Sequence, residues 1–190
     1  PVTAYGAGDI PVLVNGGFET WVGTLPDGWV KVAATAPAKD TTVFQGGAAS
    51  LKFTATDQTI SAGVKQVVGH NGCFSTLPQI TFSAYFYATT ANDDIRVRFM
   101  LNGAEVAVTT KTDILAATWT QISVNYTPTT WNDANEIQVE AFFVGDNLTG
   151  PRYIDTAAIS YSGQAYQGTA AVMGTPYQTI EYASGLYLIT

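Results

Sequence analysis

The chain has 190 residues, 46% of them apolar and only 12% charged, with a formal net charge of −7. This length suits one domain with its own core, and the acidic balance argues against nucleic-acid binding because a phosphate backbone would be repelled. A single histidine and a single cysteine exclude a zinc site made of several such ligands and an internal disulfide framework. No apolar run approaches the roughly 18 residues of a membrane-spanning helix, so no membrane partner is expected. Residues 1–10 lack the pattern of a signal peptide, which is either removed or absent.

Alternating polar and apolar residues, typical of half-buried strands, recur along the chain, whereas helical periodicity is almost absent. In chain order, this alternation predicts strands over residues 50–55, 80–87, 95–99, 105–109, 120–126, 137–143 and 153–160. Asn102-Gly103 predicts a hairpin turn between two of these strands, and a weak helical pattern at 112–117 is interpreted as a loop turn. Strands at this spacing, without intervening helices, indicate an all-β antiparallel sandwich or barrel.

The composition changes near Tyr161. From there to the end the only charge is Glu181, and five of the ten tyrosines lie in this stretch. A neutral tail rich in tyrosine and glycine would be poorly soluble if it were left free, so we expect it to pack. Residues 161–190 are therefore predicted to form either an arm that lies on a neighbouring chain or extra strands of the same domain. Residues 1–11 are predicted to form an N-terminal arm.

Five short segments carry a resemblance to a known family. They are, in order, Val14-Asn15-Gly16-Gly17-Phe18-Glu19 with the following residues 26–29, then residues 46–51, 80–85, 118–121 and 153–155. Together they resemble the jelly-roll carbohydrate-binding modules that accompany xylanases and endoglucanases. The resemblance implies an antiparallel jelly-roll β-sandwich over residues 12–160, with Trp29 and Trp119 in its core and the tail outside it. The same sandwich is reused in adhesins and phage structural proteins, so the resemblance is more specific for the fold than for sugar binding.

The resemblance also implies a structural calcium ion. In the family, the glutamate of the opening motif and the aspartate of the last strand help to hold it, and here these positions are Glu19 and Asp155. A hard cation requires several oxygen ligands, which the two carboxylates and backbone carbonyl groups near residues 45–50 could supply. The alternative is that both carboxylates only cap turns or accept backbone N–H bonds.

A candidate ligand-binding face follows from the alternation. If the large apolar residues of three strands point inward, their neighbours point outward. These neighbours are Tyr85, Tyr87, Arg96, Arg98, Gln138, Glu140 and Phe142. If the three strands share one sheet, they form a mixed aromatic and polar patch. Such a patch suits a glycan groove or a protein interface, where tyrosine and arginine are enriched. The third alternative is a face whose cross-strand ion pairs only stabilise the sheet.

Trp131 lies in a loop between two predicted strands. An exposed loop tryptophan would contact a sugar or a protein partner, whereas a buried one would anchor the loop. We favour the anchor, and keep Trp131 among the candidate binding residues.

Catalysis has little support in the sequence, so we expect no enzymatic activity. His70 and Cys73 are close together in a turn-like stretch, but no third group that would activate them is evident. The low charge and the tyrosine-rich tail favour a structural or decoration protein of a virus particle, which assembles with its own copies or with a capsid or tail protein and binds surface glycans. This hypothesis places the protein in the virion. The alternative is a carbohydrate-binding module of a secreted polysaccharide-degrading system.

Overall fold

The computed structural model describes residues 12–32, 37–54, 61–70, 79–128, 135–145, 150–162, 178–182 and 185–189. The regular structure in these ranges is β-strand, and paired strands are antiparallel. In chain order the strands are β1 (Trp21–Val22), β2 (Leu25–Pro26), β3 (Val30–Lys31), β4 (Ala38–Asp40), β5 (Ser50–Thr54), β6 (Ala62–His70), β7 (Gln79–Ala88), β8 (Asp93–Leu101), β9 (Ala104–Ile114), β10 (Thr120–Tyr126), β11 (Glu136–Phe143), β12 (Pro151–Ser162), β13 (Gln178–Tyr182) and β14 (Gly185–Ile189).

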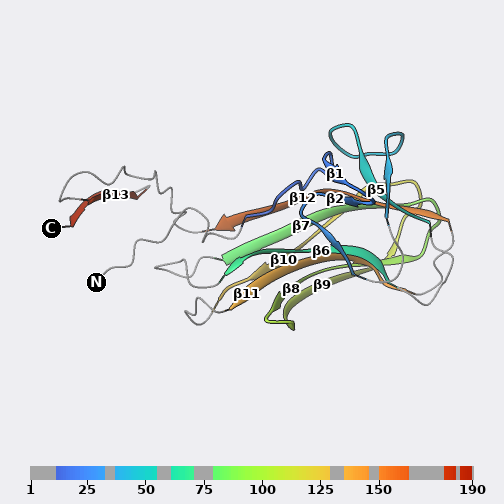
Figure 1. Cartoon of the computed structure of the whole chain (residues 1–190). Coiled ribbons are helices and arrows are strands. Elements are labelled where there is room, and N and C mark those ends of the chain that lie inside the picture. Colours follow the sequence, from blue (N-terminus) through green and yellow to red (C-terminus); the bar gives the residue numbers. More distant parts are fainter. Residues whose placement is uncertain are drawn as a thin grey trace.

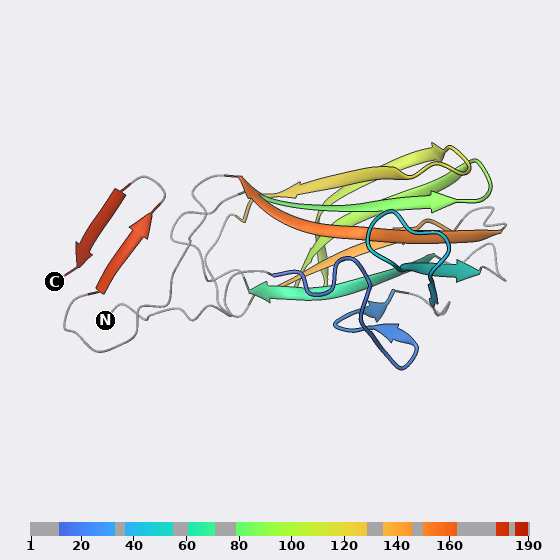
Figure 2. The same cartoon turned by 90° about the horizontal axis from the view of Figure 1, so that it is seen from above.

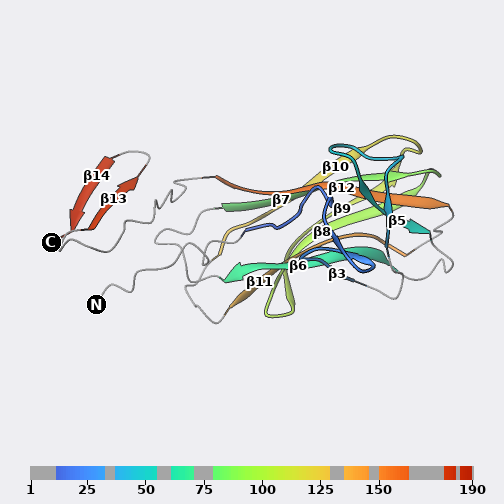
Figure 3. The same ribbon diagram turned by 45° about the horizontal axis from the view of Figure 1, so that its top comes forward.

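Two five-stranded sheets pack face to face (Figures 1 and 3). The first sheet has the strand order β10-β7-β12-β5-β4, and the second sheet has the order β3-β6-β11-β8-β9. From β5 to β12 the chain passes back and forth between the sheets, except at the β8–β9 hairpin, which stays within the second sheet. This confirms the predicted antiparallel jelly-roll β-sandwich, and its last strand ends at Ser162.

The core lies between the two sheets and follows from the alternation along each strand. The residues predicted to point inward are fully buried: Phe82, Phe86, Ile95, Val97, Phe99, Ile137, Val139 and Phe143. Edge-to-face ring contacts join the sheets, with centroid distances of 6.2 Å between Phe82 and Phe99 and 5.3 Å between Phe86 and Phe143. Aromatic pairs in this geometry contribute about 0.5–1.5 kcal/mol each beyond their buried area.

The opening motif has a structural role. Phe18 and Trp29 are both buried, and their ring centroids are 5.1 Å apart. The indole Nε1 of Trp29 donates to the backbone carbonyl groups of Val14 and Asn15, each at 3.1 Å. The predicted core position of Trp29 is therefore confirmed, and the motif residues hold the N-terminal segment against the sandwich.

Strand β6 is absent from the strands that the sequence predicted. Its residues alternate in space, but Gln66 occupies a buried position and Val67 is 48% exposed, the reverse of what their polarity predicts. The Gln66 amide donates to the carbonyl groups of Val14 and Gly28 at 3.0 Å and accepts the Val14 N–H at 2.7 Å. A buried amide whose polar atoms are paired has no signature in a hydrophobic pattern, so this strand could not be found from alternation.

The predicted hairpin turn is confirmed. Asn102 and Gly103 connect β8 to β9 with φ angles of 49° and 80°, the pair of positive values that a tight two-residue hairpin requires. The weak helical pattern at 112–117 contains the end of β9 and the turn after it, and no helix. No helix within the described residues could span a membrane.

The C-terminal strands β13 and β14 pair with each other as a separate two-stranded sheet. Figure 2 shows this hairpin apart from the two five-stranded sheets. One of the two predicted alternatives was that the tail forms extra strands of the same domain. The described part of the tail beyond β12 adds no strand to the sandwich. The predicted N-terminal arm, residues 1–11, lies outside the described residues.

Candidate functional site

The outward-pointing residues of β7, β8 and β11 do not form one patch, because β7 lies in the first sheet whereas β8 and β11 pair in the second sheet. The predicted set is divided between two outer faces: Tyr85 and Tyr87 on the first sheet, and Arg96, Arg98, Gln138, Glu140 and Phe142 on the second sheet. Alternation determines which side of a strand a residue takes, but not which sheet the strand joins.

The five residues on the second sheet form what we name the arginine face: Arg96, Arg98, Gln138, Glu140 and Phe142. Cross-strand register brings them together, since Arg98 lies opposite Glu140 and Arg96 lies opposite Phe142. The residues between them along each strand are buried in the core, which holds both strands rigidly.

Arg98 is the centre of a hydrogen-bonded network on the arginine face. Its Nη2 and Nε atoms lie 2.6 and 2.8 Å from Glu140 Oε2, and its Nη1 lies 3.1 Å from Glu105 Oε2. Gln138 Nε2 donates to the other oxygen of Glu140 at 2.7 Å. Burial lowers the pKa of Arg98, but the two carboxylates outweigh burial and raise it above the ordinary value. The planar groups of three side chains are therefore held in fixed positions.

Phe142 lies beneath the arginines. Its ring centroid is 4.9 Å from the guanidinium carbon of Arg98 and 5.8 Å from that of Arg96, and the residue is only 4% exposed. The sequence predicted an outward aromatic ring, but the guanidinium groups cover it. The arginine face therefore offers planar polar groups on an apolar base, and not an open ring.

The outer face of the first sheet carries an aromatic row that we name the tyrosine face: Tyr85, Tyr87, Trp119 and Tyr153. The Tyr87 ring lies 5.3 Å from Trp119 and 5.6 Å from Tyr153, and the ring planes are inclined by 49° and 77°. The predicted core position of Trp119 is wrong, because this half-buried residue packs against Tyr87 on the outer face. The tilted rings form a packed cluster and not a flat platform.

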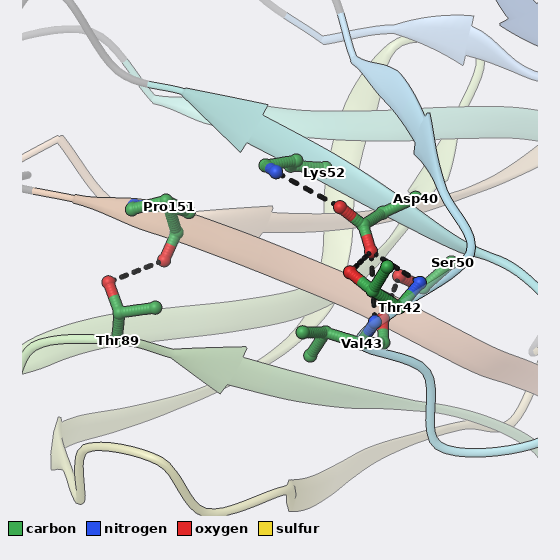
Figure 4. A network of polar contacts seen from close by, with 7 residues as sticks. All are labelled: Asp40, Thr42, Val43, Ser50, Lys52, Thr89 and Pro151. Carbon is green, nitrogen blue, oxygen red and sulfur yellow. Dashed lines mark hydrogen bonds and ion pairs between the residues drawn. The ribbon is translucent and has the colours of Figure 1, made fainter.

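Lys52 lies opposite Tyr153 on the neighbouring strand, and its ion pair with Asp40 reaches the edge strand β4 (Figure 4). Lys52 Nζ lies 3.0 Å from Asp40 Oδ2 and 5.7 Å from the centroid of the Tyr153 ring. Burial raises the pKa of Asp40, but hydrogen bonds from Thr42, Val43 and Lys52 outweigh it and hold the pKa well below the ordinary 3.8. Asp40 therefore ties the turn after β4 to the neighbouring strand β5.

Asp155 meets the loop between β4 and β5, which crosses over β12 in Figure 2. Its Oδ2 accepts the N–H groups of Gln45 at 2.7 Å and Gly46 at 3.0 Å, and its Oδ1 accepts the Thr156 N–H at 2.6 Å. Burial raises the pKa of Asp155, the three N–H groups lower it, and the nearby Glu19 raises it, so that the net shift is upward.

Glu19 binds the same loop. Its Oε1 accepts the N–H groups of Ala48 at 2.8 Å and Ala49 at 3.3 Å. The structure thus brings Glu19 and Asp155 to one loop, where both accept backbone N–H bonds. Within the described ranges, no group of three or more His, Cys, Asp or Glu side chains could hold a metal ion. A calcium ion here would need backbone carbonyl oxygens as well, because Asp155 Oδ2 and Glu19 Oε1 each already accept two N–H groups.

A buried ion pair was not foreseen from the sequence. Arg152 and Asp93 are almost completely inaccessible, and Arg152 Nη2 lies 2.7 Å from Asp93 Oδ1. Arg152 follows Pro151 in β12 and Asp93 begins β8, so the pair connects the two sheets. A charged residue in an alternating strand is normally expected to face solvent, and for this reason the sequence held no signal for it.

Three further residues were singled out in the sequence: His70, Cys73 and Trp131. His70 is the last residue of β6, where its backbone pairs with that of Glu136, and not part of a turn. Cys73 and Trp131 lie outside the described residues, so the predicted role of Trp131 stays a prediction.

No protein-family model matches this sequence, and no curated protein matches it. Solved structures do match. A cyclase from Fischerella sp. TAU has a TM-score of 0.62 at 12% identity, covering 80% of this chain and 96% of that chain. The CBM22-2 xylan-binding domain of Paenibacillus barcinonensis Xyn10C has a TM-score of 0.52 at 12% identity, covering 73% of this chain and 94% of that chain.

A third similar structure is the enzymatically active domain of bacteriophage CBA120 tailspike protein 4, with a TM-score of 0.54 at 14% identity. This chain aligns over 80% of its own length but over only 22% of the tailspike chain. An enzyme, a sugar-binding module and a phage protein thus share one architecture, and at these identities the likeness concerns the fold alone. The chain has the jelly-roll fold of carbohydrate-binding modules, as its sequence motifs indicated.

Proposed function

We propose that this protein is a non-catalytic glycan-binding sandwich whose arginine face contacts the sugar. The observation that carries the proposal is the pair of planar polar groups on Arg98 and Gln138, fixed by the buried carboxylate of Glu140 and, for Arg98, by the Phe142 ring beneath it. Sugar hydroxyl groups both donate and accept hydrogen bonds, so a guanidinium and an amide group side by side suit them. Because these groups are ordered before binding, little conformational entropy is lost on association.

The tyrosine face is the less suitable of the two outer faces. Tyr153 is only 4% exposed, and the rings of Tyr87 and Trp119 are inclined to each other. A sugar ring stacks on an open, flat aromatic surface, which this cluster does not provide.

Affinity electrophoresis in gels that contain plant, algal or bacterial polysaccharides tests the proposal. We expect at least one polysaccharide to retard the native chain, and Arg98→Ala to abolish the retardation. Tyr85→Ala is the matched control, because it removes a large half-buried side chain from the other outer face. Retardation that is lost in Tyr85→Ala and kept in Arg98→Ala would move the site to the tyrosine face. If no polysaccharide retards the native chain, the proposal is wrong.

A second candidate function is a structural or decoration protein of a virus particle. The specific observation in its favour is the hairpin of β13 and β14, which adds no strand to the sandwich. A two-stranded hairpin is only marginally stable in water by itself, so a neighbouring copy or a capsid or tail protein would stabilise it. The similar fold of a phage tailspike domain is consistent with such a setting. The two candidate functions are compatible, since a particle can carry a glycan-binding coat.

Light scattering coupled to size-exclusion chromatography tests the second candidate. We expect the full chain to form a closed oligomer and a chain without residues 163–190 to be monomeric. If both chains have the same oligomeric mass, the tail is not an assembly arm. In this setting the protein would reside in the virion, whereas a monomer that binds polysaccharide would fit a secreted module.

A further inference from the structure

We infer that the arginine face selects an acidic polysaccharide, one that carries uronic-acid carboxylates, and that Arg96 is the residue that recognises the acidic group. This inference rests on the proposed glycan-binding function and names its ligand class. It starts from the pairing of the three arginines. Arg98 and Arg152 form salt bridges with carboxylates, whereas Arg96 forms none with any described residue.

Arg96 is held in place without being neutralised. Its Nε donates to Thr110 Oγ1 at 3.0 Å, and its guanidinium carbon lies 5.8 Å from the Phe142 ring centroid. Among the described residues no hydrogen bond uses its two Nη atoms. A guanidinium anchored through Nε and supported by a ring keeps its outer edge for a ligand.

The surroundings of Arg96 favour access to that edge. In the cross-strand row that contains Arg96, the other residues are Gly63, Phe142 and Thr110. Glycine has no side chain, Phe142 is buried and threonine is short, so Arg96 is the one long polar side chain of the row. The adjacent row adds Lys65 opposite Glu140, and Glu140 is already paired with Arg98.

The charges next to Arg96 leave it available to an anion. The carboxylates of Glu105 and Glu140 are both used by Arg98. Asp94 lies two residues before Arg96 on the same side of β8, but its carboxylate accepts the Asp113 N–H at 3.0 Å and forms no salt bridge with Arg96 among the described residues. The chain has a total charge of −7, and repulsion from distant acidic residues is screened beyond the Debye length of about 8 Å at physiological salt.

A carboxylate fits the free edge of a guanidinium better than a hydroxyl pair does. The two parallel N–H groups match the two oxygens of a planar carboxylate, and such charge-assisted pairs are roughly twice as strong as neutral hydrogen bonds. Loss of such a pair corresponds to about a 10-fold or larger loss in affinity.

The test compares binding to polygalacturonate and alginate with binding to neutral xylan and xyloglucan, by isothermal titration calorimetry at low and high NaCl. We expect the native chain to bind an acidic polymer at least about 10-fold more tightly than the neutral ones, with an affinity that falls as salt rises. Arg96→Gln should abolish this preference, and Arg96→Lys should restore part of it. Lys111→Gln, which removes the same charge from exposed strand β9, is the control and should retain the preference.

Several outcomes overturn the inference. Tighter binding to the neutral polymers than to the acidic ones would refute acid selection by Arg96. An equal loss of the preference for acidic polymers in Arg96→Gln and Lys111→Gln would refute it as well. In both cases glycan binding itself stands. Absence of binding to every polymer would refute the proposed function and this inference with it. Thermal unfolding of each variant verifies that the sandwich is intact, and an Arg96→Gln chain that melts like the native chain but keeps its preference also refutes the inference.

Discussion

The buried pair of Arg152 and Asp93 offers the sharpest test of how this sandwich is held together. The two charges lie 2.7 Å apart, and both side chains are at most 1% exposed. Arg152 also donates to the Gly150 carbonyl at 2.8 Å and lies over the Phe143 ring. Asp93 Oδ2 and Arg152 Nε have no hydrogen-bond partner among the described residues. The pair is therefore only partly satisfied, and removal of one member leaves the other as an unpaired buried charge.

The expected magnitudes follow from this burial. Arg152→Met and Asp93→Leu should each lower the free energy of unfolding by about 3–5 kcal/mol, because each leaves an uncompensated charge. In a chain of this size, that corresponds to a fall in Tm of about 10 °C. The double variant replaces both charges with apolar groups, so it should lie within about 1 kcal/mol of the native chain or be more stable. The two single losses add to at least about 6 kcal/mol, so the coupling free energy is at least about 5 kcal/mol.

Urea unfolding of the native chain, the two single variants and the double variant measures this cycle. Lys111→Met, a change at an exposed position, is the control and should alter the stability by less than about 0.5 kcal/mol. If Arg152→Met costs less than about 1 kcal/mol, as an exposed pair would, or if the two single losses simply add, the pair is not a coupled buried unit and the reasoning is wrong.

Three further predictions concern the loop side of the first sheet. The pKa of Asp40 lies below its ordinary 3.8 in the folded state, so its carboxylate stabilises the fold above that pH. Asp40→Asn should therefore lower the Tm at neutral pH. The difference in Tm from the native chain should shrink as the pH falls below about 4. Gly47 has φ +69° and lies against the Glu19 carboxylate. Gly47→Ala should therefore lower the free energy of unfolding in urea by about 1–3 kcal/mol. Gly17→Ala is the control and should be tolerated, because the added methyl group meets only ordinary contacts. Calcium should raise the Tm of the native chain, and EDTA should reverse this; if Asp155→Asn responds equally, calcium does not bind at Asp155.

The sandwich could be predicted because its core strands follow simple alternation. The strand predicted at 120–126 coincides with β10, and the inward residues of β7, β8 and β11 are buried as predicted. Strand β6 could not be predicted in this way, since it buries Gln66 and exposes Val67. The hydrogen bonds that make this arrangement stable come from residues that are distant in sequence.

The candidate site was predicted residue by residue, but not as a surface. Each predicted side chain of β8 and β11 lies on an outer face, and the pairing of Arg98 with Glu140 corresponds to one of the alternatives that the sequence left open. Tyr85 and Tyr87 were grouped with them only on the condition that all three strands share a sheet, and that condition fails.

By itself, the sequence determined the all-β class, the direction in which most strand residues point, and the motifs that set the jelly roll, because these depend on neighbours along the chain. Tertiary structure alone decided which strands became neighbours. That choice separated the tyrosine face from the arginine face, placed the Arg96 and Arg98 guanidinium groups over Phe142, and paired Arg152 with Asp93 in the core. Strand order depends on contacts between distant segments, and local alternation carries no information about it.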